Sequence, residues 1–310
     1  MRAIVQRSFG TPEVLEVTEV DRPTPLPSEI VVRVQAIGLN PVEAIVRAGL
    51  FPLIGQPPFI LGWDVSGVVE EVVPGVNRFR PGDEVFGMPF FPRAANAYAE
   101  YVAAPSRQFA RKPATIDHVH AAALPLAGLT AWQSLIDIAD LKTGQRILVH
   151  GAAGGVGHLA VQIAKSRGAY VIGTASAGKH EFVRSLGADE MIDYRAVDFA
   201  EQVRDVDVVF EVIGGDYAMR SVQVLKPGGL LITAVERSNA ALATAVEKAG
   251  RRFAGITVEP DQVGLEAIAR LVDAGRLKVH VDRAFPMTEI AAAHTLLESG
   301  HLKGKLVLTV

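Results

Sequence analysis

The stretch HGAAGGVGHLAVQIAK at positions 150–165 follows an apolar run and holds three evenly spaced glycines, Gly151, Gly154 and Gly157. Glycines let a backbone pass close to another group, and an apolar strand, a glycine turn and a helix together predict the opening of a βαβ unit. The first turn of that helix presents unpaired N–H groups and the positive end of its dipole, which stabilise a pyrophosphate. The spacing, with Gly155 added, differs from the usual G-x-G-x-x-G, and a tight strand–helix turn that binds nothing remains the alternative.

Strands and helices alternate through the region around this turn. Apolar strands are expected at 146–150, 170–174, 190–194, 206–213 and 228–236. Helices are expected at 156–168, 179–187 and 264–275. A further helical pattern at 118–141 should be interrupted by Pro125 and Gly128. Strands that are nearly all apolar and separated by helices predict a doubly wound parallel sheet covered on both faces.

The first third of the chain has strands without helices between them. These strands are expected at 3–7, 14–20, 29–38, 64–73 and 74–87, separated by turns rich in Pro and Gly. Such a series predicts an antiparallel, barrel-like domain. The final segment, with extended patterns at 278–287 and 304–310 around a helical one at 288–300, is expected to return to this first domain.

The composition is that of a globular enzyme, since 49% of the 310 residues are hydrophobic and 21% are charged. A formal charge of −3 gives no basic surface for nucleic acid or an anionic membrane. No apolar run is long enough for a membrane span and the N-terminus does not resemble a secretory signal, so a cytoplasmic protein is expected. The cysteine count is zero, which excludes disulfides, thiolate catalysis and zinc sites built on cysteine.

The type of dinucleotide depends on the end of the strand that follows the glycine helix. An NAD site normally places Asp or Glu there to accept a hydrogen bond from the ribose 2′-OH. This strand instead ends in Thr174, Ala175 and Ser176, with Lys179 just beyond. A hydroxyl and an ammonium suit a 2′-phosphate, so NADPH is the expected cofactor. The alternative is that Ser176 caps the next helix and Lys179 is solvated in its first turn.

Four further stretches accompany the glycine turn: GLNPVEAIVRAG at 38–49, ILGWDVSGVVEEV at 60–72, PGDEVFG at 81–87 and AAALPLAGLTAWQSL at 121–135. With them the chain resembles, over nearly its whole length, the zinc-independent quinone oxidoreductase and alkenal reductase branch of the medium-chain dehydrogenase/reductase family. The resemblance implies a GroES-like, partly open β-barrel catalytic domain at 1–120 plus 276–310. It also implies a Rossmann dinucleotide-binding domain at 121–275, NADPH between the two domains, and a homodimer formed through strands such as FAGITVE at 253–259.

The zinc alcohol dehydrogenases of the same family differ from this chain at their metal ligands. The resemblance places Asn40 where they carry a cysteine, Trp63 and Asp64 where they carry a His-Glu pair, and Leu126 near their second cysteine ligand. Their four-cysteine lobe has no counterpart around 90–102. Without these ligands a Lewis-acid zinc cannot polarise an alcohol, so no metal site is expected and an alcohol dehydrogenase is disfavoured.

The expected reaction is therefore hydride transfer from NADPH to a small-molecule electrophile. A quinone, or the β-carbon of an α,β-unsaturated carbonyl, accepts hydride without a metal if hydrogen bonds stabilise the developing enolate. An enoyl-thioester reductase has the same requirements and remains an alternative. A catalytically silent NADPH-binding sensor is the alternative from another class.

Cofactor contacts are expected from residues that match family positions or follow the strands of the Rossmann unit. They are Thr130, Gly154, Gly155, Val156, Ser176, Lys179, Tyr194, Ile213, Ala234 and Val235. Three have ordinary structural interpretations as well. Thr130 could bond back to the preceding helical turn, Tyr194 could be a half-exposed aromatic at a strand end, and Ile213 could be a core residue.

On the catalytic side, Asn40 matches a family position beside the nicotinamide and could contact substrate or ribose. It is equally an N-cap before Pro41. Some relatives carry a possible proton donor where this chain has Ile45 and Phe51, so no side-chain general acid is identified and water is the expected proton source. Arg47 is either a cleft cation or a surface residue. The histidines His118, His120 and His158 show no metal-site spacing and are assigned no role.

Overall fold

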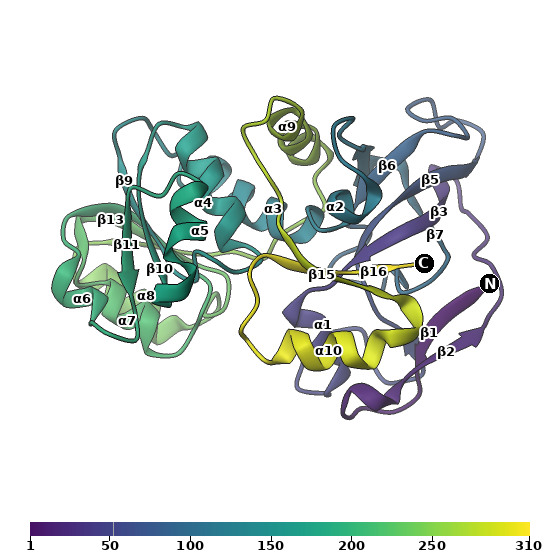
Figure 1. Ribbon diagram of the computed structural model, residues 1–310, viewed down its shortest axis with the longest axis horizontal. Coiled ribbons are helices and arrows are strands. Elements are labelled where there is room, and N and C mark those ends of the chain that lie inside the picture. Colours follow the sequence, from purple (N-terminus) through teal and green to yellow (C-terminus); the bar gives the residue numbers. More distant parts are fainter. Residues whose placement is uncertain (52) are drawn as a thin grey trace. The chain divides into compact units, whose positions relative to one another are not determined.

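In the computed structural model of the chain, which describes residues 1–51 and 53–310, the five apolar strands expected between residues 146 and 236 form one parallel sheet together with a sixth strand (Figure 1). In sheet order they are β11 (Glu190–Asp193), β10 (Tyr170–Ala175), β9 (Arg146–Val149), β12 (Val206–Glu211), β13 (Leu225–Thr233) and β14 (Arg252–Gly255). The predicted parallel sheet is confirmed. Its chain order reverses between β9 and β12, and this switch point is where open α/β sheets bind ligands.

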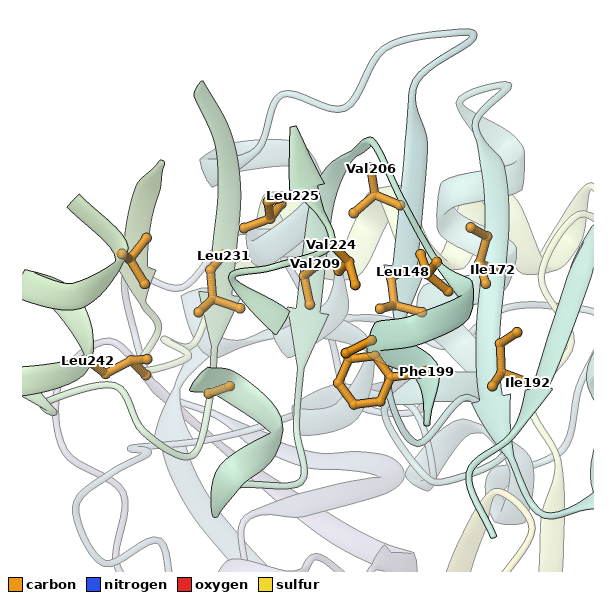
Figure 2. Close-up of a cluster of buried hydrophobic side chains, with 14 residues drawn as sticks. Leu148, Ile172, Ile192, Phe199, Val206, Val209, Val224, Leu225, Leu231 and Leu242 are labelled. Atoms are coloured by element: carbon orange, nitrogen blue, oxygen red, sulfur yellow. The ribbon is translucent and has the colours of Figure 1, made fainter. Parts of the chain in front are cut away.

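Helices cover both faces of this sheet. On one face, α6 (Phe199–Gln202), α7 (Asp216–Ser221) and α8 (Ala240–Lys248) pack on the strands through a buried apolar cluster. Figure 2 shows the side chains of that cluster, among them Phe199, Leu148, Val209 and Leu231. Right-handed crossovers place α4 (Gly157–Ser166) and α5 (His180–Ser185) on the other face, where α4 packs against β9 and β10.

The helical pattern at 118–141 is divided into α2 (His118–Ala122), α3 (Pro125–Trp132) and a π-helical turn at Gln133–Ile138. Pro125 begins α3, because proline is tolerated in the first turn of a helix. The expected interruption at Gly128 is wrong, since α3 continues through this residue, whose N–H donates to the carbonyl of Leu124, just before the helix, over 2.6 Å. Across residues 1–51 and 53–310, no helix combines the length and apolar character that crossing a membrane requires.

The first part of the chain forms two sheets. A small antiparallel sheet has the order β2 (Leu15–Glu19), β1 (Arg2–Gln6), β4 (Phe59–Ile60). In the described residues a larger seven-stranded sheet has the order β15 (Val281–Pro286), β16 (Lys305–Thr309), β3 (Glu29–Gly38), β5 (Asp64–Val72), β6 (Glu84–Gly87), β8 (Phe109–Arg111), with β7 (Tyr101–Pro105) also paired to β3. Of the stretch expected at 74–87, only β6 is a strand, because the preceding Pro- and Gly-rich residues form turns.

The larger sheet forms the expected GroES-like, partly open barrel, and the long strand β3 lies in its middle. It pairs with β5 on one side, and on the other side with β7 near its start and β16 near its end. The final segment therefore returns to the first domain as expected. Its helix α10 (Ile290–Glu298) packs on α1 (Pro41–Arg47) and on the short 3-10 turn Pro12–Val14. The other 3-10 turns are Ser106–Gln108, Ala177–Lys179 and Met287–Glu289.

The chain divides into two compact units whose limits differ from the expected domain boundaries. The first unit contains Met1–Leu129, Glu259–Gly275 and Val279–Val310, and the second contains Thr130–Val258 and Arg276–Lys278. Residues 121–129 and 259–275 thus join the first unit. The helix α9 (Gln262–Asp273) packs on β8 there, and Asp273 accepts hydrogen bonds from the backbone and hydroxyl of Thr115. Periodicity predicts this helix but not the sheet that it covers.

Candidate functional site

The glycine turn is a tight connection between β9 and α4 in the second unit. Gly151 has a left-handed φ of 59°, and the N–H of Gly154 donates to its carbonyl over 2.8 Å. A Cβ on Gly157 would lie 2.1 Å from the same carbonyl oxygen, so only glycine fits there. Gly154, Gly155 and Val156 are only partly buried, and α4 begins without a side-chain cap. The turn therefore leaves its amide-rich helix start open to an anion.

His158 belongs to the architecture of this turn. Its ring is buried in the first turn of α4, and Nδ1 lies 2.9 Å from the Gly154 carbonyl. This contact requires a protonated Nδ1 that donates, with the carbonyl as acceptor.

The residues expected at a 2′-phosphate meet at one edge of the parallel sheet. Ala175 and Asp193 are partners in the β10–β11 register and end their strands, so Ser176 and Tyr194, the residues that directly follow, leave the sheet side by side. Lys179 ends the short 3-10 turn that follows Ser176 and is partly exposed. Tyr194 is 43% exposed.

Arg195 is a further cation at this edge that sequence reasoning missed. Its guanidinium lies 5.7 Å from the centre of the Tyr194 ring, and its backbone N–H donates to Asp193. The residue was visible in the sequence as the neighbour of Tyr194, but nothing local indicated that it would lie at the end of the strand next to β10.

Two loops at the same carboxyl edge carry the residues expected at the nicotinamide. Ile213, after β12, and Val235, after β13, are each 49% exposed, so core packing does not explain Ile213. Ala234 directly precedes Val235, and its N–H donates to the Glu211 carbonyl over 3.1 Å. Thr130 is buried in α3, where the second unit begins.

In the first unit, Asn40 is the N-cap of α1, as one of its two interpretations predicts. Its backbone N–H donates to Glu43 over 2.7 Å, and Pro41 is the first helical residue. The side-chain Nδ2 donates to Asp64 over 3.0 Å and, more weakly, to Glu43 over 3.5 Å, while Oδ1 accepts from Lys305 Nζ. The amide is therefore fully engaged within the protein, and its contact with substrate or nicotinamide stays a prediction.

These contacts belong to a buried group of five residues, here called the Asn40 cluster: Asn40, Glu43, Asp64, Tyr98 and Lys305. Tyr98 donates to Glu43 over 2.8 Å, and Lys305 Nζ lies 3.7 Å from Asp64. Burial raises the pKa of Glu43 to about 7 and that of Asp64 to about 6, against the pull of the Lys305 charge. Burial likewise lowers the pKa of Lys305. One ammonium thus faces two carboxyls that hold their protons unusually well.

Arg47 is neither a cleft cation nor a surface residue. Its side chain is buried, forms a two-pronged ion pair with Glu298 at 2.8 and 3.0 Å, and contacts His294 Nδ1 over 3.2 Å. His294 in turn contacts Tyr98 over 3.0 Å, and burial lowers the pKa of His294 to about 3, so the ring is neutral. Arg47 therefore ties α1 to α10.

The pKa of Glu43 predicts a pH dependence of stability. Since the folded-state value is raised from 4.5 to about 7, its contribution is fully present below pH 4.5 and is lost as the pH rises through about 7. Glu43→Gln resembles the protonated form at every pH. The free energy of unfolding of wild type should therefore fall relative to that of Glu43→Gln by about 1–3 kcal/mol between pH 5 and 8. Urea titrations across this range measure it, and a pH-independent difference would contradict it.

The positions that hold zinc in alcohol dehydrogenases carry no suitable ligand set here. Trp63 is buried and donates its indole N–H to the Arg93 carbonyl over 2.7 Å, and the Leu126 backbone N–H donates to Asp64 over 2.8 Å. An ammonium, that of Lys305, bonds to Asn40. Among the described residues, no group of three His, Cys, Asp or Glu side chains could hold a metal ion. His118 instead contacts Ser66 and Glu84, and His120 contacts Asp117.

Comparison with known proteins agrees with this architecture. The family model for the alcohol dehydrogenase GroES-like domain matches residues 26–114, and the model named zinc-binding dehydrogenase matches residues 186–308. An Arabidopsis thaliana protein named NADPH-dependent alkenal/one oxidoreductase, chloroplastic, is 36% identical over 99% of this chain and 79% of its own length.

Two solved structures match along the full chain. The quinone oxidoreductase from Coxiella burnetii has a TM-score of 0.94 and 36% identity, covering 100% of this chain and 99% of its own. The Escherichia coli quinone oxidoreductase complexed with NADPH has a TM-score of 0.90 and 30% identity, covering 100% of both chains. The chain therefore belongs to the quinone oxidoreductase and alkenal reductase branch of the medium-chain dehydrogenase/reductase family.

Proposed function

We propose that the chain is an NADPH-dependent reductase that transfers hydride to quinones or α,β-unsaturated carbonyl compounds. The second unit binds the dinucleotide and the first acts on the substrate. The observation that carries the proposal is the carboxyl edge of the parallel sheet, where a glycine turn lies at the switch point and hydroxyl and cationic groups follow β10. The alkenal/one oxidoreductase and the NADPH-bound quinone oxidoreductase among its relatives support this cofactor.

The residues at this edge fit the parts of NADPH. Gly155 and Val156, at the start of α4, would hold the pyrophosphate through backbone N–H groups, and Gly154, whose own N–H bonds to the Gly151 carbonyl, would let it approach the backbone closely. Ser176, Lys179, Tyr194 and Arg195 would hold the 2′-phosphate through hydroxyl and cationic groups. Ile213, Ala234 and Val235 would flank the nicotinamide. When bound, NADPH supplies the hydride.

The first unit acts without a metal in this proposal. The donor set at Asn40, Trp63 and Asp64 does not fit zinc, because an amide bonded to an ammonium and an indole bonded to a carbonyl offer it no ligand pair. The substrate must therefore be electrophilic already. Ile45 is 44% exposed and, like Phe51, cannot donate a proton, so water protonates the reduced product.

A substrate panel tests this function. Loss of the reduced-nicotinamide absorbance with NADPH and quinones, 2-alkenals or enones, and no gain of that absorbance with NADP⁺ and simple alcohols, is the expected result. Turnover confined to enoyl thioesters would replace the proposal by an enoyl-thioester reductase. Tight NADPH binding without turnover across the panel would identify a silent sensor.

Lys179→Ala should raise the KM for NADPH about tenfold or more, since a charge-assisted hydrogen bond contributes on the order of 1.5–3 kcal/mol. The KM for NADH, which has no 2′-phosphate, should stay unchanged. The same two KM values measured for Arg195→Ala test whether the Arg195 guanidinium also holds the 2′-phosphate. An NADPH/NADH preference that survives both substitutions would remove the electrostatic argument.

Chelators should leave the activity unchanged, because the described residues hold no metal-binding group of three side chains. Steady-state rates are measured after prolonged incubation and dialysis with EDTA or 1,10-phenanthroline. A rate that falls with chelator and returns with added zinc would contradict the metal-free reaction.

We also propose a cytoplasmic homodimer joined through β14. This strand is the last in the order of the parallel sheet, so the strand and the residues after it offer an edge to a second copy. Light scattering on the purified protein measures its mass, and a monomer at micromolar concentration would overturn this part of the proposal.

A further inference from the structure

Glu211 is a buried carboxylate at the end of a mostly apolar strand. It is the last residue of β12, its side chain is fully buried, and it lies where the parallel sheet faces the proposed cofactor. A buried carboxylate is costly unless hydrogen bonds satisfy it. The groups that donate hydrogen bonds to Glu211 show which segments of the chain this carboxylate holds together.

One carboxylate oxygen organises the loop after β12. Oε1 accepts hydrogen bonds from the backbone N–H groups of Ile213 and Gly214, the latter over 2.6 Å. Both donors lie within three residues of Glu211, so the carboxylate turns the chain tightly back on itself. Gly214 completes the turn with a left-handed φ of 85°. Ile213 is thereby held at the tip of the loop, half exposed.

The other oxygen connects this loop to the next one. Oε2 accepts from the Thr233 hydroxyl over 2.8 Å, and Glu211 and Thr233 are register partners at the ends of β12 and β13. The same Thr233 oxygen accepts from the backbone N–H of Glu236 over 3.0 Å. The loop that carries Val235 is therefore tied to Glu211 through one intervening hydroxyl.

The two loops also touch. A Cβ on Gly214 would lie 2.8 Å from Cγ1 of Val235, so the packing leaves room only for glycine. Ile213 and Val235 are thus apolar side chains, each half exposed, on two touching loops that one carboxylate fixes.

We propose that Glu211 is a positioning residue that locks the loops 212–215 and 234–236 into one apolar platform for the nicotinamide end of NADPH. The inference rests on the proposed function, since it assigns part of that cofactor site. Glutamine removes the negative charge that strengthens all of these bonds, and its amide nitrogen would turn the Thr233 hydroxyl from a donor into an acceptor. The residue acts through the loops and touches no reacting atom.

The decisive experiment compares two ligands of the same site by calorimetry. NADPH uses both ends of the site, whereas 2′,5′-ADP carries the adenosine and its 2′-phosphate but no nicotinamide. Glu211→Gln should weaken NADPH binding about tenfold or more and leave 2′,5′-ADP binding within about twofold. Loss of both affinities in parallel would show a general structural role and overturn the proposal, as would no change in either.

Thr233 supplies a second variant and a matched control. Thr233→Val keeps the shape but removes the hydroxyl, so it should weaken NADPH in the same selective way, and Thr233→Ser should restore wild-type binding. This pair tests the platform even if Glu211→Gln does not fold. If Thr233→Val does not weaken NADPH binding selectively, the result contradicts the platform. If wild type binds neither NADPH nor 2′,5′-ADP, the proposed function itself fails; if it binds both and the variants show no split, only the platform fails.

Discussion

Gly157→Ala should reduce the affinity for NADPH about 100-fold or more, the loss of two charge-assisted hydrogen bonds to the pyrophosphate. The added methyl would lie 2.1 Å from the Gly151 carbonyl oxygen and 2.8 Å from the Ala152 Cα. Both obstacles are backbone atoms, so the start of α4 or the turn before it must move. Either movement takes the N–H groups away from the phosphates. Fluorescence or calorimetric titration with NADPH measures the effect.

A control for this variant lies at the other end of the same helix. Ser166 is the last residue of α4, and its hydroxyl donates to the Ile163 carbonyl, far along the helix from the turn. Ser166→Ala should leave NADPH affinity unchanged, and circular dichroism should confirm that both variants fold. If Gly157→Ala binds NADPH like wild type, the pyrophosphate is not held at this turn.

Lys305→Met should lower the free energy of unfolding by about 3–5 kcal/mol near pH 8. The substitution removes the ammonium that bonds to Asn40 and the Leu39 carbonyl and faces Asp64, and it leaves buried carboxyls without a positive neighbour. When those carboxyls are protonated, they carry no buried negative charge that needs a partner. The loss should therefore be smaller at pH 5, below the pKa values of about 6 and 7 for Asp64 and Glu43.

A double-mutant cycle separates this charge effect from simple loss of packing. Asp64→Asn removes the negative partner while keeping its size, so Lys305→Met combined with Asp64→Asn should be more stable than the sum of the two single losses predicts. Urea unfolding at both pH values gives the coupling energy. Additive losses, or a Lys305→Met penalty that does not change with pH, would show that the ion pair is not what stabilises the cluster.

The local features of the fold could be predicted from sequence because they depend on neighbouring residues. The glycine turn before α4, the apolar strands β9, β10 and β12, and the antiparallel strands of the first domain all have short periodic signals. Signals of this kind failed at Gly128, where helix packing outweighs a glycine's weak helix propensity. They also could not assign α9 to its unit, since periodicity carries no information about which sheet a helix covers.

The residues of the candidate site likewise divide into features that the sequence predicted and features that depended on the tertiary structure. Ser176 and Tyr194 were foreseeable as strand-end residues, but their side-by-side position depends on the β10–β11 register, and so does the presence of Arg195 beside them. Ile213 had a core interpretation that only its exposure removed. Arg47 had two interpretations, and neither anticipated its burial against Glu298.

By itself, the sequence determined that this chain builds a parallel sheet behind a glycine turn and that it carries no cysteine for zinc, because strand pattern, turn chemistry and composition are local properties. The tertiary structure alone decided that Lys305 lies against Asn40, 265 residues away, and that Glu211 joins two loops through Thr233. Such contacts follow from strand pairing between distant segments, and burial then sets the pKa values of the carboxyls enclosed there.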